Sequence, residues 1–176
     1  MKMVIAAASL TVGFLLSFPQ LAAAQSVPDS RQQIEGIIET FRTAIINKDT
    51  ASFMGLFQRE DITWAGVYTD GSVERWNASL KDPTVPRATK YHPGTPRRFI
   101  ESIARSRDIR EETFSNVRID TDGEVAHVWF DYTMMVGNHR NNWGKESWQL
   151  VRSEAGWKIA AVVWSAEENP VPRPKQ

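Results

Sequence analysis

Three apolar segments near the end of the chain constrain its fold more than any other feature. They span residues 124–136, 143–152 and 157–165, and two short stretches, 137–141 and 153–156, separate them. Apolar and polar residues alternate along much of each segment, which is typical of strands in a sheet with one buried face. Strands joined by short turns pair as antiparallel neighbours. We therefore predict an antiparallel meander of three strands.

An amphipathic helix is predicted before the meander. From Ile34 onward, apolar residues recur every three or four positions, so we expect a helix over residues 30–47 with Asp29 or Ser30 as its cap. Thr50 is expected to cap a short second helix that carries further apolar residues. The first part of the chain is thus predicted to be helical.

The remaining elements are predicted between these helices and the meander. Residues 61–68 are typical of a strand, Thr95 and Pro96 open a third helix as cap and first residue, and residues 110–120 form a weaker strand candidate. Residues 70–94 contain three prolines and little periodicity, and we expect a loop that is either a lid over a site or a surface insertion. Helices followed by a meander predict an α+β fold of one domain, with the helices packed on the sheet.

Alternation assigns the side chains of the meander to two faces. From the turn lengths we expect Tyr132 to pair with Glu146, and Trp148 to pair with Ala161. We expect the helices to cover the more apolar face. That face holds Ala126, Val128, Phe130, Tyr132, Glu146, Trp148, Leu150, Trp157, Ile159, Ala161 and Val163.

The opposite face of the meander is mixed in character. It carries His127 and Asp131 together with the large aromatic residues Trp129 and Trp164. Three helices cannot cover both faces of the sheet, and large aromatic side chains are rarely left bare to water. We therefore expect a homodimer formed through the sheet face that bears Trp129 and Trp164.

Glu146 is the exception on the apolar face, where we place it beside Tyr132. A buried carboxylate is costly unless it is paired, and burial raises its pKa. One interpretation is that Glu146 reaches an arginine or the solvent at the edge of the sheet. The other is that it serves a pocket as an acid, a base or a hydrogen-bond acceptor for a ligand.

Two stretches also carry a family resemblance. They are IIETFRTAIINKDTASFMGLF at 37–57 and DGEVAHVWFDYTMMVGNHRNNWGKESWQLVRSEAGWKIAAVVWS at 122–165. They resemble the nuclear transport factor 2-like (NTF2-like) superfamily, especially its bacterial SnoaL-like members. The resemblance implies a curved sheet wrapped around a long helix as a cone open at one end, with dimerisation through the sheet. The superfamily includes isomerases, dehydratases, hydrolases and non-catalytic binders, so it implies no single function.

Three functions remain open from the sequence. The first is the binding of a small, partly apolar or aromatic molecule in a conical pocket. The second is a cofactor-independent isomerase, dehydratase or hydrolase with Glu146 as general acid or base, assisted by Tyr132 or His92. The third is a protein-interaction module that uses the exposed sheet face. The ligand-binding residues that we expect are Trp64, Tyr68, Tyr132, Glu146 and Trp148.

Several classes of site are not favoured by the sequence. The three histidines lack metal-site spacing, and no phosphate-binding or dinucleotide-binding fingerprint is present, so we expect neither a metal nor a cofactor. Lys+Arg and Asp+Glu both number 21, which argues against a nucleic-acid partner. Residues 81–110 are locally basic and include Arg97 and Arg98, which either attract an anion to the mouth of a pocket or form a solvated face.

Residues 1–24 are typical of a secretory signal peptide. Lys2 precedes a long apolar run, and three alanines ending at Ala24 follow it. The apolar run is shorter than the ~20 residues needed to span a bilayer. We expect cleavage after Ala24, a periplasmic or secreted protein without a membrane anchor, one domain at 25–169, and a proline-rich, frayed tail at 170–176.

Overall fold

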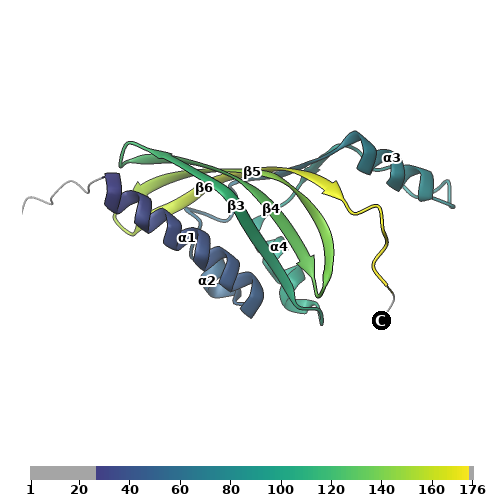
Figure 1. The fold of residues 1–176 in the computed structure, drawn as a ribbon, viewed down its shortest axis with the longest axis horizontal. Helices are drawn as coiled ribbons and strands as arrows, with labels where there is room; N and C mark the ends of the chain where they lie inside the picture. The colour runs from purple at the N-terminus through teal and green to yellow at the C-terminus, as the bar shows by residue number, and fades with distance from the viewer. Residues whose placement is uncertain (1–26, 175–176) are drawn as a thin grey trace, which may run out of the picture.

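A computed structural model describes residues 27–174 and shows a curved sheet that arches over three helices (Figure 1). The predicted signal peptide lies outside the described residues. The sheet has six strands in the order β2-β1-β6-β5-β4-β3, and the predicted α+β fold is confirmed. Helices α1, α2 and α4 lie on the concave side, whereas α3 projects beyond the sheet (Figure 1). The elements are α1 (Val27–Asn47), α2 (Thr50–Met54), β1 (Thr63–Tyr68), α3 (Asp70–Ser79), β2 (Tyr91–Pro93), α4 (Pro96–Arg105), β3 (Arg110–Thr121), β4 (Val125–Val136), β5 (His139–Ser153) and β6 (Gly156–Glu168).

The long helix α1 buries the apolar face that the spacing predicts. Ile34 and Phe41 lie on this face and belong to the core under the sheet. The helix begins at Val27, so the predicted caps Asp29 and Ser30 both lie within its first turn. Polar and acidic residues are favourable at a cap and in the first turn alike, so their presence does not fix the first residue of a helix.

The caps of the two other helices on the concave side differ in how well the sequence predicts them. At α2 the cap is Asp49, whose carboxylate accepts a hydrogen bond from the Ser52 amide at 3.0 Å. Thr50, the predicted cap, is the first residue of the helix because Asp49 already occupies the capping geometry. At α4, Thr95 is the cap and Pro96 the first residue, as predicted.

The predicted loop at residues 70–94 instead begins with the helix α3. Thr69 caps this helix by accepting a hydrogen bond from the Ser72 amide, and within the predicted loop residues 80–90 and Gly94 lack regular structure. Ser72 is the buried residue of α3, so the helix has no apolar stripe. Periodicity could not reveal it for that reason.

The sheet is antiparallel except where β1 lies beside β6 in parallel. Two parallel strands must be joined by a long crossover connection. Here that connection is the chain between β1 and β6, which contains the elements from α3 to β5. On its other side β1 pairs with β2, a short strand that the sequence did not predict. This arrangement brings the middle of the chain to the edge of the C-terminal meander.

The turn between β4 and β5 is tighter than predicted. It consists of Gly137–Asn138 rather than residues 137–141, and Gly137 has a φ of 58°, which glycine adopts readily. The shorter turn and a bulge at Asn141 together move the register by two residues, so Glu146 pairs with Phe130 rather than with Tyr132. A shift of two residues keeps each side chain on its predicted face.

The register between β5 and β6 is also different from the prediction. One extra residue on β6 interrupts the ladder, so Trp148 pairs with Val162 rather than with Ala161. Such a β-bulge reverses the faces of all side chains beyond it. Val162 is accordingly fully buried, whereas Val163, which the prediction placed inside, is 42% exposed.

The same bulge turns Trp164 to the concave side of the sheet. Its ring centroid lies 5.4 Å from that of Trp64, within the core. Trp129 alone of the two predicted interface tryptophans remains on the outer face, where it is 39% exposed. The predicted homodimer surface therefore does not include Trp164.

Aromatic packing fills the space between α1 and the sheet. The ring of Phe41 lies 4.7 Å from that of Phe53 and 4.8 Å from that of Trp148, between centroids. Phe130 meets the Trp148 ring edge-on at 5.1 Å. Each such ring contributes about 1.5–3 kcal/mol by leaving water, so these four residues account for much of the stabilisation on the concave side.

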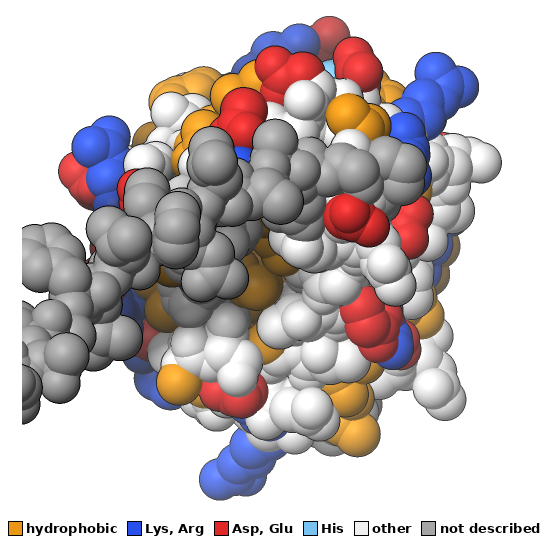
Figure 2. Space-filling model, turned by 90° about the vertical axis from the view of Figure 1, so that its left-hand side faces the viewer, with side chains coloured by type: hydrophobic (Ala, Val, Ile, Leu, Met, Phe, Trp, Pro, Cys, Tyr) orange, Lys and Arg blue, Asp and Glu red, His pale blue; other side chains and the backbone are white. Residues whose placement is uncertain are grey.

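The surface outside the core is mixed in charge and carries scattered apolar side chains (Figure 2). Acidic and basic side chains are interspersed on the end of the molecule that Figure 2 shows. The chain after β6 has no regular structure up to Pro174. In this segment the Arg173 guanidinium forms an ion pair with Asp108, and the shorter of the two N–O distances is 2.7 Å. No helix within residues 27–174 is long and apolar enough to cross a membrane.

Candidate functional site

The concave side encloses a cavity of about 150 Å³ near the start of β3 and β5. Side chains from all six strands line it, and α1 and α4 contribute one phenylalanine each. Six aromatic side chains, three carboxyls and one arginine are among the lining residues. The lining is Phe41, Trp64, Tyr68, His92, Phe99, Arg110, Glu112, Tyr132, Met134, Asn141, Asn142, Glu146, Trp164, Ala166 and Glu168.

Two buried carboxyls form the floor of this cavity. Glu112 on β3 and Glu146 on β5 are each 4% exposed, and their side chains are hydrogen-bonded to each other. Glu146 also accepts a hydrogen bond from the indole N–H of Trp148 at 2.6 Å. The pair therefore has one fixed donor, and within residues 27–174 no basic side chain forms an ion pair with either member.

Burial changes the proton affinity of both carboxyls. It raises the pKa of Glu112 well above its ordinary value, and the charge of Glu146 raises it further. Burial raises the pKa of Glu146 to about 7, although hydrogen bonds from Trp148 and Glu112 act in the opposite direction. The two carboxyls therefore titrate as a coupled pair that binds protons more tightly than free glutamates do.

Tyr132 lies on β4, between the strands that carry the two carboxyls. Its hydroxyl is buried and has no hydrogen-bond partner among the described residues. Burial raises the pKa of this hydroxyl, and the nearby Glu112 and Glu146 raise it further. Tyr132 therefore offers a neutral O–H group to whatever enters the cavity.

The rim of the cavity is formed by polar and aromatic groups from three strands. The Tyr68 ring on β1 lies 5.6 Å from the His92 ring on β2. On β6, Glu168 accepts a hydrogen bond from the Asn142 side chain at 3.3 Å, and burial raises the pKa of Glu168. A ligand that reaches the carboxyl pair must pass these groups.

Arg110 is the single arginine that lines the cavity, two residues before Glu112 on the same strand. Its Nε atom is buried and has no hydrogen-bond partner among residues 27–174. The charge of Arg110 lowers the pKa of Asp108, but Arg110 is not a cause of the raised pKa values of Glu112 or Glu146. Among residues 27–174, Arg110 forms no ion pair with either carboxyl.

The structure brings five of the six predicted site residues to one cavity. Trp64, Tyr68, His92, Tyr132 and Glu146 all line it. Trp148 does not: it is fully buried behind Glu146, which it orients through its indole N–H. One interpretation had Glu146 reach an arginine or the solvent; instead it is 4% exposed, and its partners among the described residues are Glu112 and Trp148.

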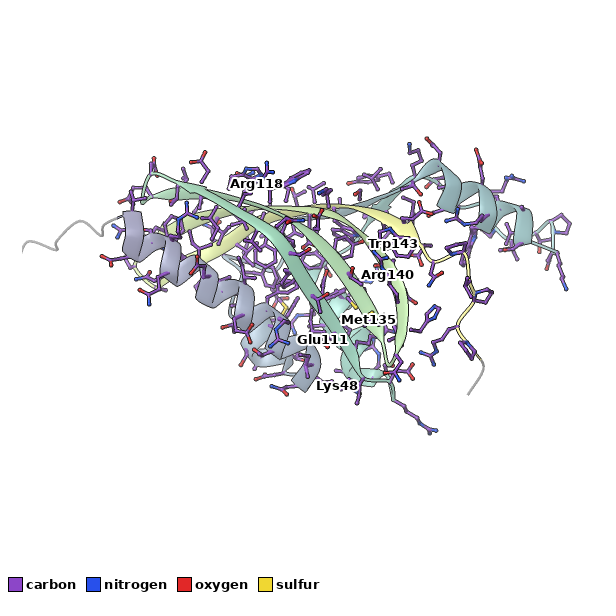
Figure 3. All side chains as sticks on the ribbon, viewed as in Figure 1. Lys48, Glu111, Arg118, Met135, Arg140 and Trp143 are labelled. Carbon is purple, nitrogen blue, oxygen red and sulfur yellow. The ribbon has the colours of Figure 1, made fainter. Side chains whose placement is uncertain are left out.

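Glu112 was not among the residues predicted for the site, although the sequence carries a signal for it. Glu111 and Glu112 are adjacent on a strand, and adjacent strand residues face opposite ways. One of them had to point to the concave side. Glu111, labelled in Figure 3, binds Arg42 of α1 at 2.9 Å, whereas Glu112 lines the cavity.

A larger groove of about 710 Å³ continues from the cavity. The two spaces share Tyr68, His92 and Glu168 as lining residues. Side chains of α3, residues 86–91 and the segment after β6 form the rest of the groove. The helix that replaces the predicted loop thus borders the entrance to the cavity.

The basic residues that the sequence singled out lie apart from the cavity. Arg97 binds Glu60, with 2.7 Å between its Nε atom and a carboxylate oxygen, and Arg98 is exposed. Neither residue lines the cavity or the groove. Of the two interpretations, the solvated face describes Arg97 and Arg98.

The outer face of the sheet has its own polar and aromatic contacts. His127 and Ser147 lie 3.0 Å apart between ring nitrogen and hydroxyl, beside the exposed Trp129. Near the start of β5 the guanidinium of Arg140 lies 3.8 Å from the Trp143 ring centroid (Figure 3). Among the described residues, no group of three or more potential metal ligands could hold a metal ion.

Comparisons with known proteins identify the fold. No protein-family model matches the sequence, and no curated protein matches it significantly. Among solved structures, an NTF2-like superfamily protein from Salmonella enterica has a TM-score of 0.56 at 17% identity, covering 83% of this chain and 96% of that chain. An NTF2-like protein of unknown function from Shewanella baltica has a TM-score of 0.57 at 13% identity, covering 82% and 99%. An NTF2-like protein with a cystatin-like fold from Novosphingobium aromaticivorans has a TM-score of 0.54 at 12% identity, covering 79% and 82%. The chain thus has the NTF2-like, cystatin-like fold that the sequence resemblance implied.

Proposed function

We propose that the protein binds a small, partly apolar molecule in the cavity on the concave side of the sheet. One observation carries this proposal: the buried Tyr132 hydroxyl faces the cavity without a partner, beside the hydrogen-bonded Glu112 and Glu146. A buried polar group without a hydrogen bond costs about 1–3 kcal/mol. A ligand that supplies the missing partner removes this cost.

The surroundings of Tyr132 define the shape of the ligand. The cavity volume of about 150 Å³ equals that of an engineered protein cavity that accommodates benzene. Trp64 and Trp164 supply flat apolar walls. The ligand therefore has a compact apolar or aromatic part and one polar group that reaches the floor.

A second candidate function is proton transfer on the bound molecule. It is favoured by the pKa of Glu146, which burial raises to about 7, because a general acid or base works best when its pKa lies near the operating pH. In this function Glu146 exchanges the proton, while the Tyr132 hydroxyl donates a hydrogen bond to an oxygen of the substrate. His92 lies at the rim and is placed to contact a group of the substrate there.

Native mass spectrometry of the protein purified gently from its host tests the binding function. A small molecule retained at one per subunit supports the proposal, and its loss in Tyr132→Phe places it in this cavity. Retention of the same molecule in Tyr132→Phe and in Trp64→Ala would contradict the proposed site. For the enzyme candidate, Glu146→Gln is expected to retain the molecule but to lose its conversion.

Secretion and dimerisation remain separate proposals. We infer secretion from the signal-like residues 1–24, and the mass of the protein purified from its host tests whether cleavage follows Ala24. We infer a homodimer through the outer sheet face that bears Trp129, and Trp129→Ser is expected to yield monomers in size-exclusion chromatography. A wild-type monomer at all concentrations would instead favour a protein-interaction function for this face.

A further inference from the structure

We propose that the molecule bound in the cavity is a small organic cation, a protonated amine with an apolar or aromatic body. The inference rests on the proposed binding function and adds the charge of the ligand to it. Three features support it: carboxyls without a cationic partner, walls of aromatic rings, and a hydroxyl oxygen that is free to accept a hydrogen bond.

The first feature is the excess of carboxyls around the cavity. Glu112, Glu146 and Glu168 all line it, and none of them forms an ion pair with a described residue. Arg110 also lines the cavity, but among the described residues no ion pair joins it to any of these three carboxyls. An ammonium group placed over the Glu112–Glu146 pair would supply the cation that the protein itself does not provide there.

The second feature is the composition of the walls. The cavity is lined by the rings of Phe41, Trp64, Phe99 and Trp164, and Tyr68 adds a fifth ring at the rim. Neighbouring rings in this wall lie 5.3–6.5 Å apart between centroids and at different angles. Aromatic faces attract cations with about 0.5–2 kcal/mol each. Ring walls with carboxyls at one end are suited to an amine.

The third feature is the hydrogen-bonding capacity at the floor. The Tyr132 oxygen has no partner, and the Glu146 carboxylate, which accepts from Trp148 and Glu112, retains lone pairs for a further donor. An ammonium group has three N–H donors and no acceptor. Such a group can donate to Tyr132 and to Glu146 at once, and it completes the contacts that the cavity leaves open.

Amine binding should release a proton from the carboxyl pair. A cation stabilises the ionised form of Glu146, so binding lowers its pKa and drives off the proton that the free protein holds. Affinity for an amine should therefore rise with pH between about 5 and 8, which is the window set by the raised pKa of Glu146. The titratable and charged groups that face this site are Tyr68, His92, Arg110, Glu112, Tyr132, Glu146 and Glu168.

A matched set of three one-ring probes tests the inference: benzylamine, benzyl alcohol and benzoate. Binding to the full protein is measured by quenching of tryptophan fluorescence, since Trp64 and Trp164 line the cavity. Calorimetry at about pH 6, below the Glu146 pKa of about 7, in two buffers of different ionisation enthalpy then measures the proton released. We expect benzylamine to bind at least about tenfold more tightly than benzyl alcohol at pH 8, which corresponds to about 1.4 kcal/mol. We also expect Glu146→Gln to abolish this preference and most of the proton release.

The outcomes separate the charge of the ligand from the existence of the site. Benzyl alcohol binding as tightly as benzylamine would overturn the amine inference and leave the proposed binding site standing. Tighter binding of benzoate, lost in Arg110→Met, would overturn it in favour of an anion held by the arginine. No binding of any probe, with unchanged fluorescence, would count against the proposed function itself. The control variant is Glu154→Gln, which removes a carboxyl from the exposed turn before β6 and leaves the cavity unchanged.

Discussion

Replacing Glu146 by glutamine tests whether the buried carboxyl pair behaves as its surroundings predict. Burial raises the pKa of Glu146 from its ordinary 4.5 to about 7. Between these pH values the folded protein holds a proton that the unfolded chain releases. The free energy of unfolding must therefore fall as the pH rises through this window. Glutamine has nearly the same shape, does not titrate, and can still accept the hydrogen bond from Trp148.

The size of the effect follows from the interval between the two pKa values. Each pKa unit corresponds to about 1.4 kcal/mol, so the interval from 4.5 to about 7 corresponds to about 3 kcal/mol of stability. This stability is fully present below pH 4.5 and is lost once the pH exceeds about 7. The raised pKa of Glu112 acts in the same direction at higher pH.

Urea unfolding between about pH 5 and 8, followed by tryptophan fluorescence, measures this dependence. We expect the wild type to lose about 3 kcal/mol across the range, and Glu146→Gln to remove most of this slope. At pH 8 the variant should be the more stable protein. Glu154→Gln, in an exposed turn, serves as the control and should keep the wild-type slope.

Two results would refute the reasoning. A wild-type stability that is constant or rises between pH 5 and 8 would mean that Glu146 is ionised in the folded protein at low pH. A slope that persists in Glu146→Gln would assign the titration to another group, of which Glu168 is the first to test because burial also raises its pKa.

Three further substitutions probe the surroundings of the pair. Trp148→Phe removes the donor 2.6 Å from Glu146 and should lower the free energy of unfolding by about 2 kcal/mol. It should also move the pH window upward, because this hydrogen bond lowers the pKa of Glu146; urea unfolding across pH checks both. Tyr132→Phe should change stability by less than about 1 kcal/mol, because the lost hydroxyl has no partner. The same variant should lose ligand in native mass spectrometry, and a large loss of stability would reveal a structural hydrogen bond instead. Gly144→Ala should destabilise the protein by about 3 kcal/mol in thermal unfolding, since its Cβ would lie 2.0 Å from the Ser165 carbonyl oxygen; an unchanged Tm would show that the strands can separate there.

The sequence predicts the meander and the inward position of Glu146 because both follow from alternation along strands. Alternation survives a register error of two residues, which is why the wrong pairing of Glu146 with Tyr132 still placed both residues on the concave side. It does not survive a bulge. One extra residue on β6 moved Trp164 from the predicted outer face into the cavity, and no residue type near it announces that insertion.

Glu112, the second carboxyl of the pair, was not predicted for a different reason. Residues 110–120 are rich in polar and charged residues, so they gave only a weak strand signal, and the inward Glu112 was not recognised. The helix α3 was missed for a related reason, because it projects from the sheet and has no apolar face to reveal it. Both features lie where the chain departs from the pattern of a stable core, and both lie at the site or beside it.

The energetics of the pair argue that it is kept for a purpose other than folding. At neutral pH the ionisation of Glu146 opposes folding, and one atom change to glutamine should relieve that cost without altering the packing. Such stabilising substitutions are generally available to proteins, and the places that resist them are typically sites where function requires an unfavourable arrangement. Tyr132, whose hydroxyl contributes no hydrogen bond within the described protein, belongs to the same arrangement. A ligand that pairs with Glu146 and Tyr132 together explains both residues, whereas a purely structural role explains neither.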